Sequence, residues 1–462
     1  MSIIKAYTLP HPPLAVPAVG RGKESKGIAD TLQALESVAL EIADIAPETI
    51  IFITPHSVLY SDYFHISPGD EANGDLGRFG APEIKFQTVY DKELISEITR
   101  VAEYNDIPAG TLGEREASLD HGVTVPMWFI NKHYTDYKSI RISQSGMAAG
   151  EHYILGQAIA KAAESTGKRV VLVASSDLSH KLQNDAPYGF APEGPEFDKI
   201  ITEAIKEGDF LSILKIPDTL RERAGECGYN SLTILAGSFD RFNVEANLLS
   251  YEGPFGVGYA VASFKPGEKN EDKNILEQFL ENELKVLEEK RNTEDDYQNL
   301  ARQSLEHVIL NGSKMSVPAS VSGELLSKRA GVFVSLHKSG KLRGCIGTIA
   351  PTTENIANEI IQNAVSAGLS DERFNPVTKD ELPFIVYKVD DLSEAEEITG
   401  PDELDVKRYG VIVTSGYKRG LLLPNLDGVD TVEEQINIAK SKAGILPSET
   451  VKLERFEVIR HE

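Results

Sequence analysis

Cysteine is scarce in this sequence of 462 residues, which contains only Cys227 and Cys345. The two lie far apart, so a disulfide scaffold and a cysteine-rich zinc or iron–sulfur cluster are excluded. Free cysteines fit a reducing compartment. We therefore expect a cytoplasmic protein.

Basic residues are also scarce, with 47 Lys and Arg against 71 Asp and Glu and a formal net charge of −24. A surface of this sign repels nucleic acid and anionic lipid, so neither is expected as a partner. No apolar run approaches the ~20 residues that span a bilayer. The N-terminal sequence MSIIKAYTLPHPP also lacks the apolar core of a signal peptide. The sequence leaves a homo-oligomer open.

The composition, 41% hydrophobic and 26% charged, is that of a folded chain, and its length predicts two or three domains. One stretch, 265–296, is unusually rich in charge and opens with a Pro-Gly breaker. Helical spacing of apolar residues follows, at Ile275, Leu276, Phe279, Leu280, Leu284 and Leu287. We predict a first domain over 1–265, a charged linker and helix over 266–295, and a second domain over 296–462.

In the first domain, short apolar runs alternate with helical patterns. The predicted strands are Ile3–Leu9, Thr49–Thr54, Ser139–Ile142 and Arg169–Ser175. The predicted helices are Gly27–Ala46, Asp91–Tyr104, Glu151–Thr166, Pro195–Glu207 and Gly228–Phe242. This alternation predicts an α/β sandwich with helices on both faces of a sheet.

The second domain is predicted to be smaller and of the α+β class. A helix over Tyr297–Asn311 precedes a hairpin that joins Gly331–His337 to Lys341–Ile349. A second helix and three strands follow, over Thr353–Gly368, Phe384–Val389, Gly410–Ser415 and Gly420–Pro424.

Three histidines, His11, His56 and His180, follow the ends of predicted strands in the first domain. Ligands of open α/β sheets bind beyond the carboxyl ends of the strands, so the three could converge on one crevice. Each one alone could equally be a turn residue bonded to nearby backbone. Their repetition favours a shared site, and a proline stiffens the backbone before His11 and His56.

A neutral imidazole binds iron, zinc or copper, and a ligating histidine usually donates its other nitrogen to an acceptor. Asp120 and Asp177 could be such acceptors, and His121 is a further candidate for the site. A site of two histidines and one carboxylate needs a third ligand, for which Glu226 and Cys227 are available. Glu226 could instead complement a helix dipole, and Cys227 could be a small buried apolar residue. We place Glu226 first because a hard carboxylate suits Fe(II).

Six motifs occur in order along the first domain: LPHPP, ITPHS, LDHGVTVP, SSDLSH, ECGYNSL and PFGVGYAVASF. Together they resemble the class III extradiol dioxygenase (LigB-type) family, and its Memo-like branch most. The resemblance implies that His11, His56 and either Glu226 or Cys227 hold a non-haem Fe(II), with Zn as the competing metal. It also implies that His180 is the acid/base and that His121 supports a ligand or orients the substrate. We count Asp177 with these two as a catalytic candidate.

The function that follows is an Fe(II)-dependent oxidoreductase that opens the ring of an aromatic or phenolic small molecule. His180 would take a proton from a ring hydroxyl. The alternative is a metal-binding adaptor without oxygenase activity that works with a separate enzyme.

The second domain contains the motif LRGCIGT, in which Arg343, Gly344, Cys345 and Gly347 lie on a predicted strand. Arg343 could lower the thiol pKa of Cys345, or the cysteine could simply pack between glycines. With YQNLARQSLEHVILNG, SDERFNPV and GLLLPNLDGVDTVEEQI, the motif resembles the AMMECR domain family. The resemblance implies that Asp371, Arg373 and Phe374 share the surface of the motif.

A Memo-like domain fused to an AMMECR domain resembles the AmmeMemoRadiSam arrangement. That resemblance implies a radical S-adenosylmethionine protein as partner. This chain lacks the three clustered cysteines that such an enzyme needs, so the partner would be a separate polypeptide.

Overall fold

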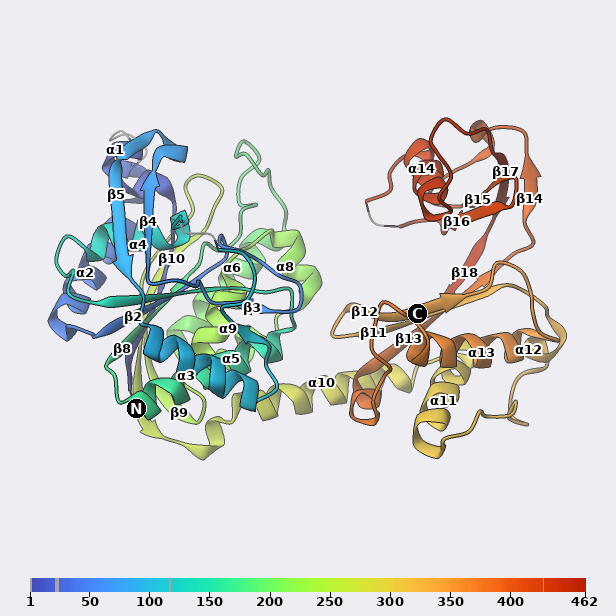
Figure 1. The fold of residues 1–462 in the computed structure, drawn as a ribbon, viewed down its shortest axis with the longest axis horizontal. Coiled ribbons are helices and arrows are strands. Elements are labelled where there is room, and N and C mark those ends of the chain that lie inside the picture. The colour runs from blue at the N-terminus through green and yellow to red at the C-terminus, as the bar shows by residue number, and fades with distance from the viewer. Residues whose placement is uncertain (1, 21–24, 116–117, 427) are drawn as a thin grey trace. The chain divides into compact units, whose positions relative to one another are not determined.

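The computed structural model describes residues 2–20, 25–115, 118–426 and 428–462. The chain divides into two compact units, Met1–Glu281 and Asn282–Glu462 (Figure 1). Each unit has its own hydrophobic core, and each is described by itself below.

The first unit is built on a six-stranded sheet. Its strand order is β7 (Lys138–Ser143), β2 (Thr49–Thr54), β8 (Val170–Ser175), β1 (Ile3–Leu9), β10 (Tyr259–Lys269) and β9 (Phe242–Glu252). The first four strands are parallel, and β10 and β9 run antiparallel to their neighbours. Every residue of β2 and β8 is buried, as expected for central parallel strands covered on both faces.

Helices form a layer on each face of this sheet. On one face α2 (Ala29–Ile45) and α4 (His121–Ile130) contact each other and the sheet. On the other, α3 (Lys92–Tyr104), α5 (Ala149–Thr166) and α9 (Tyr229–Gly237) pack together. The buried residues of α2 recur at helical spacing, at Thr31, Ala34, Leu35, Val38, Ala39 and Ile42. The predicted α/β sandwich is confirmed.

Smaller elements connect these layers. They include the hairpin of β4 (Glu71–Leu76) and β5 (Ala81–Val89) with η3 (Gly77–Phe79) at its turn, β3 (Phe64–His65), β6 (Ala109–Gly110), α6 (Glu193–Glu207), α7 (Phe210–Leu214) and α8 (Asp218–Ala224). None of the described helices combines the length and the apolar character needed to cross a bilayer.

One predicted helix is too long in the first unit. The helix expected over Gly228–Phe242 ends at Gly237, and Phe242 already begins β9. Arg241 adopts a left-handed backbone conformation (φ 59°), which turns the chain out of the helix and into the strand. The antiparallel strands β9 and β10 were not predicted.

The predicted charged helix is α10 (Ile275–Arg291), whose residues extend across the boundary between the two units. Ile275 and Phe279 of its first turns are buried in the core of the first unit. The predicted domain limits at 265 and 296 remain a prediction.

The second unit contains two four-stranded sheets and is of the predicted α+β class. One sheet has the order β12 (Lys341–Gly347), β11 (Val332–Lys338), β13 (Ile385–Leu392) and β18 (Val458–His461), with α11 (Asp296–Asn311) and α13 (Ile356–Leu369) packed on it. The other has the order β14 (Glu396–Ile398), β17 (Lys452–Phe456), β15 (Gly410–Ser415) and β16 (Lys418–Leu422), with α14 (Val432–Lys442) beside it. The short helix α12 (Gly323–Ser327) contacts α13.

The predicted hairpin of this unit has a tighter turn than expected. Lys338 pairs with Lys341, which leaves only Ser339 and Gly340 in the turn. Both have positive φ, 49° and 75°, as a two-residue turn of type I′ requires.

Candidate metal centre

Three neighbouring strands bring the candidate histidines together. In the sheet β1 and β2 flank β8 in parallel, and Leu9 lies beside Ser175 at the carboxyl ends. His11 follows β1, His56 follows β2, and the segment that ends in His180 follows β8. The sheet therefore presents all three residues at one edge.

Three ligand atoms meet there. His11 Nε2 lies 3.0 Å from His56 Nε2 and 3.7 Å from Cys227 Sγ. All three atoms lie within 4.8 Å of one another, as the ligands of a single ion must. Across the described part of the chain, no other group of three His, Cys, Asp or Glu side chains meets this condition.

A hydrogen-bond relay orients His11. Ser175 Oγ donates to the Gly122 carbonyl at 2.5 Å, so the hydroxyl proton is already used. His11 Nδ1, 2.8 Å from the same oxygen, must therefore donate to it. This leaves the lone pair of Nε2 directed at His56 and Cys227. A metal-ligating histidine needs an orientation of this kind.

The electrostatics of the cluster favour neutral imidazoles. Burial, followed by repulsion from His56, His121 and His180, lowers the pKa of His11 far below its usual value. Burial also lowers the pKa of His56 to about 4, with a further contribution from His121. Two neutral imidazole nitrogens at 3.0 Å, beside a thiol, form a set of donors ready for a cation.

Cys227, and not Glu226, lies with the two histidines. Cys227 is placed by the turn between α8 and α9, and its thiol lies 3.7 Å from the Asp177 carbonyl. The Glu226 carboxylate instead accepts the backbone N–H of Tyr229 at 2.7 Å, at the start of α9. The sequence argument put Glu226 first as the third metal ligand. In the structure its carboxylate instead binds a backbone N–H, because the first N–H groups of a helix have no partner within the helix. Burial raises the pKa of both the Glu226 carboxyl and the Cys227 thiol.

His121 contacts both ligand histidines, and its ring meets that of His11 edge-on with centroids 5.3 Å apart. It begins α4, and its ring stacks on that of His56 with centroids 4.1 Å apart. The ring of Phe79 also lies edge-on to that of His121, with centroids 5.3 Å apart. Burial, and then the nearby cation of Arg78, lower the pKa of His121 to about 4. His121 is therefore uncharged at neutral pH and lines the site.

His180 and Asp177 complete the group. Nε2 of His180 is buried and has no hydrogen-bond partner among the described residues, and the His180 ring lies 5.2 Å from that of Tyr188. Asp177 accepts the backbone N–H of His11 at 2.8 Å, and its other oxygen lies 3.6 Å from His11 Nε2. Burial raises the pKa of Asp177 to about 7.

Sequence reasoning missed several residues of the site. Ser175 orients His11, and Gln144 donates to the Cys227 carbonyl at 2.8 Å and to Ser231 Oγ at 2.8 Å. Phe79 and Tyr188 flank the histidines. Ser175 was within reach, since it ends a predicted strand. Gln144, which directly follows β7, could have been found in the same way, whereas Phe79 and Tyr188 come from segments whose approach only the fold determines.

The motif of the second unit contains paired groups. Arg343 forms a two-pronged ion pair with Glu381 at 2.9 and 3.0 Å. Asp371 accepts the backbone N–H of Cys345 at 2.8 Å and binds Arg373 at 2.7 and 2.9 Å. Burial raises the pKa of the Cys345 thiol, although Arg373 opposes this shift. Of the two alternatives that the sequence left open for Cys345, activation by Arg343 has no support, because that guanidinium is taken up by Glu381.

The two glycines of the motif allow close packing. A Cβ on Gly344 would lie 2.1 Å from the Ala367 carbonyl oxygen of α13, and one on Gly347 would overlap the Phe333 ring. Phe374 lies under the Arg373 guanidinium at 5.5 Å. The motif thus joins β12 to α13 and to the segment that follows it.

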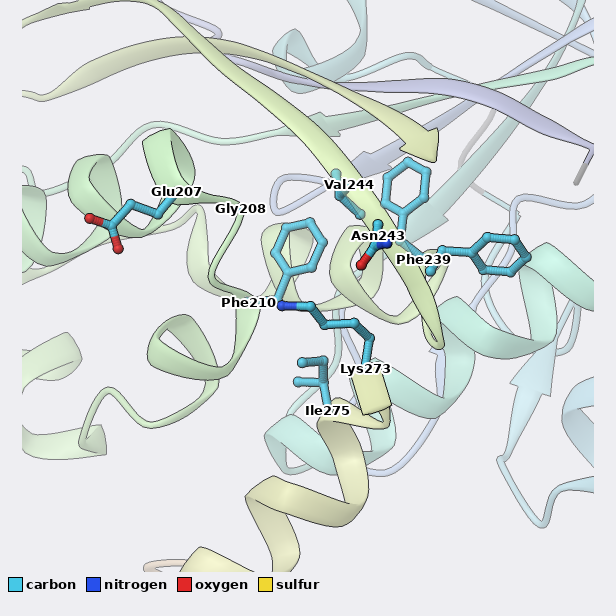
Figure 2. A pocket seen from close by; sticks show the side chains of 9 residues that line it. Glu207, Gly208, Phe210, Phe239, Asn243, Val244, Lys273 and Ile275 are labelled. Atoms are coloured by element: carbon cyan, nitrogen blue, oxygen red, sulfur yellow. The ribbon is translucent and has the colours of Figure 1, made fainter. Parts of the chain in front are cut away.

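A separate hollow of about 110 Å³ lies in the first unit between the start of β9 and the residues after β10 (Figure 2). Because β10 runs antiparallel to β1, this is the opposite end of the sheet from the histidines. Phe210, Phe239 and Ile275 line it, and the Glu207 carboxylate points away from it. No ligand set for a metal occurs there among the described residues.

Comparisons with known proteins agree with this division. Residues 5–262 match the family described as the catalytic LigB subunit of aromatic ring-opening dioxygenase, and residues 298–461 match the AMMECR1 family. A protein of Clostridium acetobutylicum is 44% identical over 471 residues, covering 100% of both chains. A protein of Thermotoga maritima is 50% identical over 171 residues, which cover 37% of this chain and 98% of that protein.

Two solved structures of uncharacterized proteins are also similar to parts of the chain. One, from Pyrococcus horikoshii, is 30% identical, covers 36% of this chain and 88% of that chain, and gives a TM-score of 0.34. The other, from Escherichia coli K12, is 14% identical, covers 57% and 99%, and gives a TM-score of 0.38. The LigB match extends over more than half of the 462 residues, so the chain belongs to the LigB family of aromatic ring-opening dioxygenase subunits and carries an AMMECR1 domain at its C-terminal end.

Proposed function

We propose that the first unit is a non-haem metal oxidoreductase that acts on an aromatic, phenolic small molecule, with Fe(II) as its metal. The observation that carries the proposal is the convergence of His11 Nε2, His56 Nε2 and Cys227 Sγ within 4.8 Å at the carboxyl ends of parallel strands. The family match supports the reaction class.

The donor set fits a divalent metal of the first transition row. Two neutral imidazoles and a thiol that becomes a thiolate suit iron, zinc or copper better than magnesium or calcium. A cation would also relieve the cost of enclosing the Cys227 thiolate, whose pKa burial raises. When bound, Fe(II) would supply a Lewis acid and a path for electrons from an aromatic ring to oxygen.

His180 is the proposed acid/base. Its Nε2 has no partner in the described structure, and burial lowers the pKa of the ring, so the nitrogen is free to accept a proton near neutral pH. It lies close enough to His11 to lower the pKa of that residue. A phenolic hydroxyl held beside His11 could therefore pass its proton to His180 Nε2.

Two aromatic side chains favour a planar substrate. The ring of Phe79 lies 5.3 Å from that of His121, and 36% of the Phe79 surface is exposed. The ring of Tyr188 lies 5.2 Å from that of His180, and 61% of the Tyr188 surface is exposed. Exposed rings on two sides of a polar cluster offer faces on which an aromatic ring can stack. These rings would hold the substrate plane against the histidines and exclude water.

The test is to load metal-free protein with Fe(II) without oxygen and to record the EPR spectrum of its nitric oxide adduct. Cys227→Ser and Glu226→Gln form a matched pair, because the residues are adjacent and only the first lies with the histidines. We expect a high-spin signal in the wild type that Cys227→Ser alters and Glu226→Gln preserves. No adduct in the wild type, or the opposite behaviour of the pair, would refute the assignment.

A further inference from the structure

Asp198 of α6 is a buried carboxylate without a cationic partner. Only 1% of its surface is exposed, and the groups of the described chain that shift its pKa include no Lys, Arg or His. Burial raises its pKa to about 7. A carboxylate kept in such a place costs free energy, so its hydrogen bonds identify what it supports.

Both oxygens of Asp198 are used. Oδ1 accepts the backbone N–H of Ser179 at 2.8 Å, and Oδ2 accepts the phenol of Tyr251 at 2.7 Å. The start of β10 makes room for the carboxylate, because a Cβ on Gly258 would lie 2.0 Å from Oδ2. The carboxylate is thus enclosed by β9, β10 and the segment after β8.

Ser179 connects Asp198 by hydrogen bonds to two segments of the metal centre. Its backbone carbonyl accepts the N–H of Gly258 at 2.8 Å, and its hydroxyl donates to the Ala224 carbonyl at 2.9 Å. The neighbouring backbone N–H of His180 donates to the same Ala224 carbonyl at 3.3 Å. Ser179 lies between Asp177 and His180, and Ala224 ends the helix that precedes Cys227.

The same two segments touch again at the thiol itself. Cys227 Sγ lies 3.7 Å from the Asp177 carbonyl, and a Cβ on Gly228 would lie 2.8 Å from that oxygen. The segment around Cys227 therefore lies directly on the segment that carries Asp177 and His180. A displacement of Ser179 would therefore shift both segments.

We propose that Asp198 is a positioning residue of the metal centre. Through Ser179 it fixes the positions of both His180 and Cys227, and the hydrogen bond from Tyr251 holds the Asp198 carboxylate in place. The effect of Asp198 on catalysis rests on the proposed function. Its effect on the positions of His180 and Cys227 rests on the hydrogen bonds alone. Asp198 itself touches neither the ligand atoms nor the space between them.

Two substitutions separate positioning from mere burial. Asp198→Ala leaves the Ser179 N–H and the Tyr251 phenol without acceptors. Asp198→Asn keeps an oxygen for Ser179, and its amide can donate to the Tyr251 oxygen. The alanine variant is therefore expected to release the two segments, and the asparagine variant to restore them. Tyr251→Phe, which removes one hydrogen bond, covers the case in which the alanine variant does not fold.

The matched control is Asp91→Ala. Asp91 is equally buried, binds Lys168 at 2.7 and 2.9 Å and accepts the Thr49 hydroxyl at 2.6 Å. Because Thr49 begins β2, this carboxylate lies at the far end of the sheet from the metal centre. Asp91→Ala is expected to destabilise the fold without altering the centre.

The first readout needs no metal. In a Cys345→Ala background, the rate at which a disulfide reagent reacts with Cys227 is measured in metal-free full-length protein. Asp198→Ala or Tyr251→Phe is expected to raise this rate, and Asp198→Asn and Asp91→Ala to leave it near that of the parent. Equal rates in Asp198→Ala and the parent, or an equal rise in Asp91→Ala, would overturn the proposal.

The second readout uses Co(II) as the probe, because a thiolate bound to it absorbs in the near ultraviolet. Asp198→Ala is expected to weaken this band and to lower Co(II) affinity by about tenfold, as the loss of support for a ligand does. A parent protein without the band would refute the metal assignment, while the thiol rates would still decide the role of Asp198.

Discussion

The metal centre of the first unit and the LRGCIG motif of the second differ in how their polar groups are satisfied. At the centre, the nitrogens of His11 and His56 face each other, and Nε2 of His180 has no partner in the described structure. In the motif, Arg343 is taken up by Glu381, and Asp371 by Arg373 and the backbone of Cys345. A site that binds a ligand leaves donors or acceptors open, whereas a structural motif closes them.

The two cysteines sharpen the contrast. Burial raises the thiol pKa of both. Cys227 has two imidazole nitrogens within ligand distance, so a metal can make it a thiolate. Cys345 has no such neighbours in the described structure and only its backbone N–H and carbonyl are engaged. The same residue type thus has different expected roles in the two units.

The largest expected effect concerns His180. His180→Gln should lower the turnover of a probe such as 4-nitrocatechol by roughly 10²–10⁴-fold, the usual contribution of a general acid/base. Fe(II) affinity should stay unchanged, because His180 is not one of the three ligands. His133→Gln is the control, since this histidine pairs with Glu36 on the surface. Equal turnover in the two variants would remove His180 from the mechanism.

An intermediate effect is expected at the Arg343–Glu381 pair. Burial alone would raise the pKa of Glu381, but the hydrogen bonds from Arg343 and Thr378 outweigh it and lower the pKa to about 2. Because the folded pKa lies below the unfolded value of 4.5, the pair stabilises the fold above that pH. This stabilisation, about 1–2 kcal/mol once solvent screening is allowed for and shared with Thr378 and Lys338, is lost as the pH falls through about 2.

Arg343→Ala should therefore lower the stability of the second unit at neutral pH and much less in acid. Urea unfolding followed by circular dichroism reports both units, whereas the fluorescence of Trp128, the single tryptophan, reports the first. Only the circular dichroism transition should shift. Lys388→Ala, which removes an exposed ion pair to Glu462, should shift neither by more than about 0.5 kcal/mol. A shift in Trp128 fluorescence with Arg343→Ala would contradict this division.

The smallest expected effect is that of Cys345→Ala. Its side chain is half-buried and belongs to no group of metal-ligating side chains in the described structure. We therefore expect the free energy of unfolding to fall by about 1 kcal/mol or less. Fe(II) binding by the first unit should not change. A large loss of metal affinity would show that the motif takes part in the centre and would end the contrast drawn above.

Much of the framework could be read from local patterns. Thr49–Thr54 and Ile3–Leu9 are mostly apolar stretches, and the structure has both strands with the same bounds. Polar residues after such runs in parallel strands must share an edge, which is why His11 and His56 could be placed together. The β9–β10 hairpin could not be read in this way, because β9 is exposed at alternate residues and begins after a turn at Arg241.

The sequence by itself determined the family, the two-part organisation, and the strand-end histidines, because each depends on residues close together in the chain. Only the tertiary structure decided that Cys227 lies with His11 and His56 while its neighbour Glu226 accepts the backbone N–H of Tyr229. Adjacent side chains at a helix start point in different directions, and only the packing of the 224–228 segment on the segment after β8 selects which one faces the centre. The role of Asp198 likewise depends on contacts with Ser179, Tyr251 and Gly258, which are distant in the sequence.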